Sequence, residues 1–227
     1  MSNFLTTSIG RKFLMSISGL FLMVFLVVHL TANLLLIFDD SGELFNQGAH
    51  FMVTNPIVRI MEPILALGFV IHIIWSFFIS LQNMKARPIK YNKLSNSQSS
   101  AWASRNMLVL GSLILVFLIL HIMDFYWKIR YTGDPSLTTI NVSGTEMENT
   151  YALVAGLFKT NLLYCVIYII GAILLGFHLG HGFWSSFQTI GLANKVWLKR
   201  LQFVGQIYAI LIAVGFAIIP LYFQLKF

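Results

Sequence analysis

Residues 13–38 read FLMSISGLFLMVFLVVHLTANLLLIF, and this stretch decides the class of fold. It contains no Asp, Glu, Lys or Arg. A helix of about 20 mostly apolar residues crosses a hydrocarbon core of about 30 Å, so the stretch is long enough to span a membrane. It also outlasts the apolar part of a secretory signal, and no A-x-A site follows it. We therefore expect it to remain in the protein as a transmembrane helix.

Four more segments share this length and hydropathy, namely residues 56–84, 106–126, 161–187 and 203–225. The whole chain is 57% hydrophobic and 10% charged, with a mean hydropathy of +0.78, whereas soluble domains carry about 25% charged residues. The connecting segments 85–104 and 131–159 are too polar and too short to form domains. The sequence therefore predicts an all-α integral membrane protein, a single domain of five transmembrane helices over residues 1–227.

The charges predict an orientation, because Lys and Arg accumulate in cytoplasmic loops. A cytoplasmic N-terminus places ten of the fifteen basic residues on inner segments: Arg11, Lys12, Lys85, Arg87, Lys90, Lys93, Arg105, Lys195, Lys199 and Arg200. All eight acidic residues then fall on outer segments or outer helix ends: Asp39, Asp40, Glu43, Glu62, Asp124, Asp134, Glu146 and Glu148. The C-terminus is expected outside. The net charge of +7 is thus a topological feature and does not indicate a nucleic-acid partner.

The sequence lacks the residues that several kinds of cofactor attachment and catalysis require. Cys165 is the single cysteine, so the chain has no cysteine cluster for an iron–sulfur centre and no C-x-x-C-H motif for covalent haem attachment. No phosphate-binding glycine motif, no nucleophile elbow and no pair of carboxylates in an expected cleft occurs. The chain by itself is not expected to make or break covalent bonds in a soluble substrate.

Histidines are the unusual residues of the apolar segments. His29 and His121 belong to a short internal repeat, because Met15-x3-Gly19-x5-Phe25-x3-His29 matches Met107-x3-Gly111-x5-Phe117-x3-His121. Both histidines lie about 25 Å along the helix from basic residues at its start, so they are expected at one depth in the outer half of the membrane. On the two helices of opposite direction, His72 and His178 are each followed one turn later by a small residue and then an aromatic one.

An intramembrane histidine indicates a functional site by default, because burying a polar side chain in hydrocarbon is costly. An interhelical hydrogen bond, at about 0.6 kcal/mol, is the simpler explanation for one such residue. Such hydrogen bonds are a weaker explanation for four histidines that lie on four different helices and form two pairs at matching depths. Neutral imidazoles suit iron, and two that face each other can hold a porphyrin between them, so four indicate two haems. Glycines such as Gly19, Gly111 and Gly176 suit close approach either to a porphyrin or to another helix.

The pattern as a whole resembles the di-haem cytochrome b membrane anchor of succinate:quinone oxidoreductases and fumarate reductases. The resemblance covers essentially the whole chain and combines one histidine in each of four helices with two local motifs. The first motif is Ser8, Gly10, Arg11, Lys12, Met15, Gly19 and His29, and the second is His178, Gly182, Phe183 and Trp184.

The resemblance implies two b haems stacked across the membrane. His72 and His178 would ligate the proximal haem, and His29 and His121 the distal one. The H-x3-G pattern favours His178 on the fourth helix, while a rival alignment of Trp75 with Trp184 favours His181; the residue not used would contact a propionate or line the inner surface. The chain would be the non-dehydrogenase subunit of a bacterial cytoplasmic-membrane complex whose flavoprotein and iron–sulfur subunits carry FAD and the clusters.

The resemblance also implies a quinone, expected to be menaquinone, that reacts near the distal haem. The candidates for proton handling there are Glu43, His50, Arg59 and Glu62. Some family members carry a glutamate two residues before the proximal ligand of the fourth helix; this sequence has Gly176 there, which favours an electrogenic reaction. Two other interpretations stay open: a di-haem anchor of a hydrogenase, formate dehydrogenase or nitrate reductase, and a non-haem proton channel or transporter.

Overall fold

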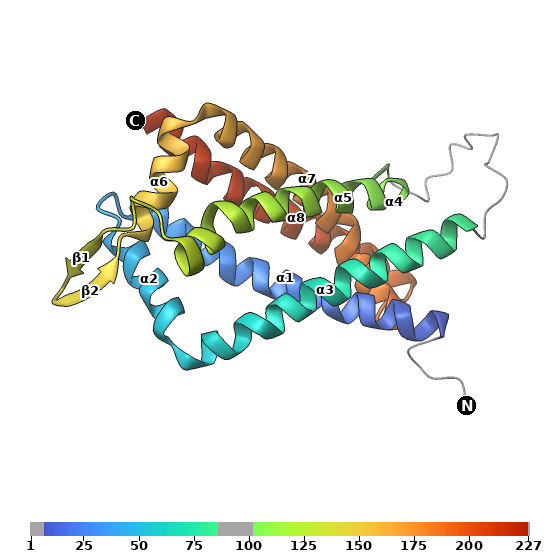
Figure 1. Ribbon diagram of the computed structural model, residues 1–227. Helices are drawn as coiled ribbons and strands as arrows, with labels where there is room; N and C mark the ends of the chain where they lie inside the picture. The colour runs from blue at the N-terminus through green and yellow to red at the C-terminus, as the bar shows by residue number, and fades with distance from the viewer. Residues whose placement is uncertain (1–6, 86–101, 227) are drawn as a thin grey trace.

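The computed structural model describes residues 7–85 and 102–226 (Figure 1). Its bundle consists of α1 (Ser8–Phe38), α3 (Pro56–Lys85), a helix that spans Met107–Thr132, α7 (Leu162–Thr189) and α8 (Lys195–Lys226). All five are long and apolar enough to cross a membrane, which confirms the predicted all-α multi-pass protein. Three of the basic residues used for the orientation, Arg87, Lys90 and Lys93, lie outside the described residues.

The third span changes its winding along its length. After the short α4 (Trp102–Arg105), α5 (Met107–His121) continues into two π-helical segments, η2 (Ile122–Tyr126) and η3 (Lys128–Thr132). Wider π-helical turns are rare and occur often at functional sites. The span therefore runs six residues past the expected end at 126, and the change of winding begins directly after His121.

The other helices also extend beyond the apolar stretches that predicted them. α8 begins at Lys195 rather than at 203, because hydropathy marks the part of a helix that suits hydrocarbon, whereas Lys195, Lys199 and Arg200 continue the helix into the interface. At the start of α1, the Thr7 hydroxyl accepts a hydrogen bond from the Gly10 amide at 3.1 Å and caps the helix five residues before the expected boundary.

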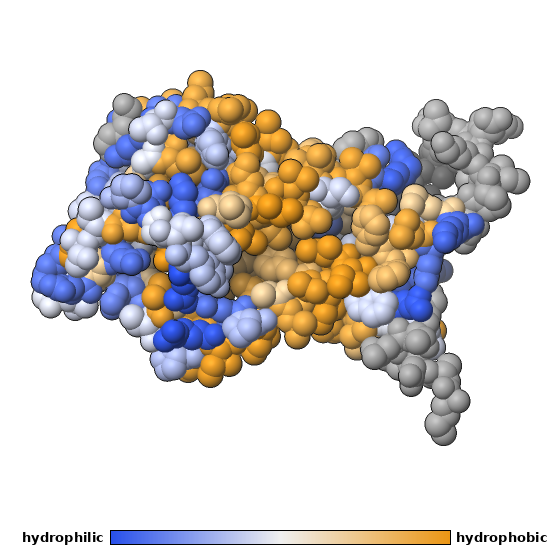
Figure 2. Space-filling view, in the orientation of Figure 1, coloured by the Kyte–Doolittle hydropathy of each residue, from blue (hydrophilic) through white to orange (hydrophobic). Residues whose placement is uncertain are grey.

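The bundle has two polar ends, with an apolar belt between them (Figure 2). The first, the basic end, carries Lys12, Lys85, Arg105 and Lys195. Helices α1, α5 and α8 begin at this end, and α3 and α7 end there. The opposite one, the capped end, carries the segments between α1 and α3 and between the third span and α7. Because the number of spans is odd, the start of α1 and the end of α8 lie at opposite ends of the bundle (Figure 1).

The cap is built from α2 (Glu43–Thr54), the antiparallel hairpin of β1 (Thr139–Val142) and β2 (Thr145–Glu148), and α6 (Thr150–Thr160). The sequence predicted only polar connections here. Asn46 joins the pieces: its buried amide nitrogen donates to Asn149 at 3.1 Å, and its oxygen accepts from the Tyr151 backbone at 2.7 Å. At the turn before α2, the backbone amide of Leu44 donates to Asp39 and holds the pKa of that carboxyl below its ordinary value.

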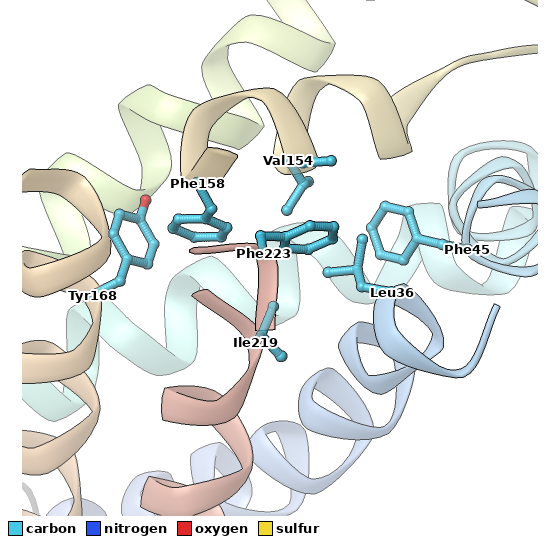
Figure 3. Packing of buried hydrophobic residues seen from close by; sticks show 8 residues of the cluster. Leu36, Phe45, Val154, Phe158, Tyr168, Ile219 and Phe223 are labelled. Atoms are coloured by element: carbon cyan, nitrogen blue, oxygen red, sulfur yellow. The ribbon is translucent and has the colours of Figure 1, made fainter. Parts of the chain in front are cut away.

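The principal hydrophobic core lies where the cap meets the bundle. Its residues come from α1, α2, α6, α7 and α8, and Figure 3 shows how their side chains interlock. Phe223 and Leu36 are completely buried at its centre, and Phe158 stacks parallel to Phe223 with ring centroids 6.4 Å apart. The membrane-spanning part of α3, in contrast, buries little of its surface within the chain. The core thus joins α1, α7 and α8 to the cap, whereas most of the surface of α3 is not buried within the chain.

The cap depends on one glycine at the start of α2. Gly42 has a φ of +76°, and a Cβ added there would lie 2.3 Å from the Tyr151 ring. A Gly42→Ala variant is expected to lose about 2 kcal/mol or more of stability, because it combines left-handed strain with overpacking. Thermal unfolding of the purified protein in detergent measures the loss.

Gly144 provides the matched control for this prediction. It has a φ of +85° at the hairpin turn, and nothing lies within 4 Å of an added Cβ. Gly144→Ala is therefore expected to lose only the strain component, about 1 kcal/mol. Equal losses in the two variants would mean that the contact with Tyr151 does not constrain Gly42.

Candidate functional site

A cavity of about 2130 Å³ runs through the bundle between α1, α3, α5 and α7. This volume is about twice the upper end of the usual range for small-molecule sites. Most of its lining is apolar, and five histidines belong to it: His29, His72, His121, His178 and His181. The helices that the sequence predicted to carry histidines are thus the helices that enclose the cavity.

The first pair of histidines joins α1 to α5. The rings of His29 and His121 have centroids 5.8 Å apart and are perpendicular to each other. Each stacks on the phenylalanine one turn before it on its own helix, Phe25 on His29 at 5.2 Å and Phe117 on His121 at 6.0 Å. Aromatic contacts of this kind restrict the rotation of the imidazoles, so the pair is held facing across the cavity.

The second pair joins α3 to α7, closer to the basic end. The rings of His72 and His178 have centroids 6.2 Å apart at an interplanar angle of 74°. The Ser18 hydroxyl lies 3.5 Å from Nδ1 of His72. The structure therefore brings His72 opposite His178. His181 lines the same cavity, and its ring meets Trp184 edge-on at 4.8 Å.

The internal repeat in the sequence corresponds to a repeat in space. A Cβ added to Gly19 would lie 3.4 Å from His72, and one added to Gly111 would lie 3.8 Å from His178. The first half of each repeat thus lies beside a histidine of the second pair, and the last residue of each repeat is a histidine of the first pair. Gly176 is placed differently, because its added Cβ would lie 2.9 Å from the Cβ of Ala213. It serves the packing of α7 against α8.

The spacing of both pairs fits a metal ion bound between two imidazoles. A metal-bound imidazole nitrogen lies about 2 Å from the metal, so two ligands on opposite sides put their ring centres about 6 Å apart. The observed separations are 5.8 and 6.2 Å. In residues 7–85 and 102–226, no three His, Cys, Asp or Glu side chains gather to hold a metal ion by themselves. The remaining ligands would have to come from a cofactor, as they do in haem, and the cavity has the room.

The second ring nitrogens of the four histidines have different surroundings. Nδ1 of His29 lies 3.5 Å from the Asn33 amide, as Nδ1 of His72 does from Ser18. Nδ1 of His121 and of His178 are buried and have no hydrogen-bond partner among the described residues. Metal-bound histidines usually donate their second N–H, which orients the ring. His72 fits this pattern, because the Ser18 hydroxyl can accept from its Nδ1–H. Nδ1 of His29 instead faces the Asn33 NH2 group, which donates. His121 and His178 are oriented by their aromatic and glycine neighbours.

The four candidates for proton handling lie at different places. Glu62 lines the cavity near the capped end, where its carboxylate accepts a hydrogen bond from Arg130 at 2.5 Å in a half-buried ion pair. Glu43 and Arg59 are exposed and do not line the cavity. His50 belongs to a separate groove of about 370 Å³ between α2 and the hairpin.

Arg130 was not among the candidates that the sequence suggested. It follows the expected end of the third span at residue 126 by four residues. The π-helical turns of η3 place it opposite Glu62 on α3, so the pair links two helices that enclose the cavity. The signal that the sequence offers for this contact is an acidic residue near the start of one span and a basic residue near the end of the next.

The comparisons with known proteins bear on none of these contacts. The chain matches no family model, no curated protein and no solved structure. The assignment of the site therefore rests on the two facing pairs, the cavity between them and the repeat that positions them.

Proposed function

We propose that this chain is a di-haem cytochrome b that anchors a succinate:quinone oxidoreductase in a bacterial cytoplasmic membrane. The observation that carries the proposal is the pairing of four histidines from four helices, at two depths of one cavity, with ring separations of 5.8 and 6.2 Å. The resemblance in sequence supplies the type of enzyme, and the geometry supports the two binding places.

In this proposal His72 and His178 hold the proximal haem, and His29 and His121 hold the distal one. Bound haem supplies an iron that carries one electron at a time. The residues of the chain fix its position: Phe25 and Phe117 orient the distal imidazoles, and Gly19 and Gly111 leave space beside the proximal ones. Most of the cavity lining is apolar, which would limit the access of water to both haems.

The direction of the bundle follows from the positive charges. The basic end faces the cytoplasm in this proposal, because Lys and Arg of short loops remain on that side. The iron–sulfur and flavoprotein subunits dock there, next to the proximal pair. The capped end faces outward and takes the quinone, expected to be menaquinone, near the distal pair.

The primary test is the haem content of the complex, purified from the native membrane through a tag on this chain. Two b haems per chain, extracted quantitatively and seen in a reduced-minus-oxidised optical spectrum, are expected, with reduction by succinate. A colourless complex would overturn the cytochrome proposal. The complex could instead contain two haems that succinate does not reduce, but that exchange electrons with hydrogen, formate or a nitrate-reductase partner. That result would support the cytochrome and overturn the choice of enzyme.

Glu62 provides a second test at the quinone end. A Glu62→Gln variant removes a proton-exchanging group from the cavity wall and is expected to lower quinone reduction by succinate about a hundredfold, the lower range for a positioned acid–base group. Haem content and succinate-driven reduction of a soluble dye are expected to stay unchanged. Glu43→Gln, an exposed glutamate away from the cavity, serves as the control. A wild-type quinone rate in Glu62→Gln would exclude Glu62 from the reaction.

A further inference from the structure

A buried carboxylate lies beside the distal pair and has no place in the function proposed above. Asp124 is on η2, three residues after His121, with 9% of its surface exposed. The other seven acidic residues of the chain are all more exposed. An ionisable side chain inside a spanning segment is costly and marks a functional site by default.

Asp124 has one hydrogen-bond donor and no ion-pair partner within the described ranges. The Tyr168 hydroxyl of α7 donates to its Oδ2 at 2.9 Å. The nearest basic residue on its own helix is Lys128, one turn further on, and its ammonium pairs with Asp134 at 3.2 Å instead. A carboxylate that accepts a single hydrogen bond has spare acceptor capacity, and its charge is not fixed by a bound cation.

Tyr168 connects this carboxylate to the distal pair. Its ring lies 5.9 Å from the ring of His121 and 5.1 Å from that of Phe117, which stacks on the same imidazole. It also lines the cavity. The other charged or titratable groups facing the pair Asp124–Tyr168 are Lys128 on η3, Tyr164 on α7, and His29 beyond His121. A change of charge between His29 and His121 therefore acts on Asp124 across one aromatic ring.

We propose that Asp124, hydrogen-bonded to Tyr168, is the proton-exchanging site coupled to electron transfer at the distal pair. The inference rests on the proposed function. Asp124 would bind one proton from the aqueous phase at the capped end as an electron from the iron–sulfur partner reaches a haem held by His29 and His121. Asp124 would release that proton as the electron passes to the quinone. Because one proton accompanies each electron, the net charge of the site does not change. A low-dielectric environment favours this, because an uncompensated charge there is costly.

The test is the reduction potential of each haem at a series of pH values. The distal haem is identified as the one missing from a His121→Ala complex. In the wild type its potential is expected to fall as pH rises, because an ionised carboxylate favours the ferric state. In Asp124→Asn that potential is expected to be constant with pH and equal to the acid limit of the wild type. The potential of the proximal haem is expected to be unaffected.

Two further variants serve as controls. Asp134→Asn removes an outer carboxylate near the same lysine, and the pH dependence of the distal potential is expected to remain. Tyr168→Phe keeps the ring against His121 and removes the donor, so the pH dependence is expected to remain with its midpoint displaced. Redox-difference infrared spectra give a readout that does not need Asp124→Asn to fold. A carboxylic acid C=O band is expected to appear on reduction and to shift in Asp124→Glu.

The outcomes separate this inference from the proposed function. A wild-type distal potential independent of pH, or an Asp124→Asn complex with the wild-type dependence, would overturn the inference and leave the cytochrome standing. The absence of a carboxylic acid band on reduction of the wild type would overturn it as well. A complex without haem would overturn both.

Discussion

In the proposed di-haem cytochrome, a His121→Ala complex is expected to contain one haem in place of two. The imidazole of His121 faces His29 at 5.8 Å, and its removal would leave the proposed distal haem with a single protein ligand. Bound cofactor stabilises the folded state by mass action, so a fall in the unfolding temperature is expected as well. Quantitative haem extraction and reduced-minus-oxidised spectra measure the loss, and the remaining signal is that of the proximal haem.

The other histidines test whether the pairs are assigned correctly. His29→Ala is expected to lose the same spectral component as His121→Ala, and the double variant is expected to lose no more, because both residues serve one site. His72→Ala and His178→Ala are expected to lose the other component. His181→Ala is the matched control on the same helix as His178, and both haems are expected to stay. Loss of a haem in His181→Ala and not in His178→Ala would contradict the pairing seen across the cavity.

A Gly171→Ala complex is the second variant for which a large effect is expected. A Cβ on Gly171 would lie 2.6 Å from the Phe117 ring, closer than two carbon atoms can approach. Phe117 cannot move aside easily, because it stacks on His121 and meets Tyr168 edge-on. The added methyl group must therefore separate α5 from α7. Overpacking of this kind costs about 1–3 kcal/mol, and the distal haem is expected to be lost or spectrally altered.

Gly156→Ala is the control for that substitution. Gly156 lies in α6, and nothing is within 4 Å of an added Cβ. Alanine in the middle of a helix favours folding by about 0.5–1 kcal/mol over glycine, so this variant is expected to be slightly more stable with both haems retained. Thermal unfolding and the optical spectrum are measured together. A Gly171→Ala complex with the wild-type spectrum would show that α5 and α7 can separate without disturbing the distal pair.

The spans were predictable because hydropathy is a local property. Residues 56–84 correspond to α3 almost without error, since Pro56 starts that helix and Lys85 ends it. The errors lie in the polar turns, as at Lys195, where the helix continues beyond the hydrocarbon. The cap was missed for a related reason. Its α2 and hairpin are stabilised by contacts such as that of Asn46 with Asn149, which are more than a hundred residues apart in the chain.

The histidines were predictable as residues and only partly as a site. Their placement in apolar helices is unusual enough to mark them, and the repeat of Met15 to His29 in Met107 to His121 indicated a common depth. For several glycines, however, the sequence did not distinguish close contact with a porphyrin from close contact with another helix. The structure separates them, because Gly19 lies beside His72 whereas Gly176 packs on α8. Which face of a helix a residue occupies relative to its neighbours depends on how the helices are rotated, and one sequence does not contain that information.

The sequence by itself determined that this protein crosses a membrane with five helices and that four of them carry histidines, because length and hydropathy decide which segments enter hydrocarbon. The tertiary structure alone decided that His72 lies opposite His178, that Arg130 reaches Glu62, and that Asp124 turns inward to Tyr168. Each of these contacts joins different helices. Their partners are selected by packing and by the π-helical turns after His121, and neither leaves a local pattern in the chain.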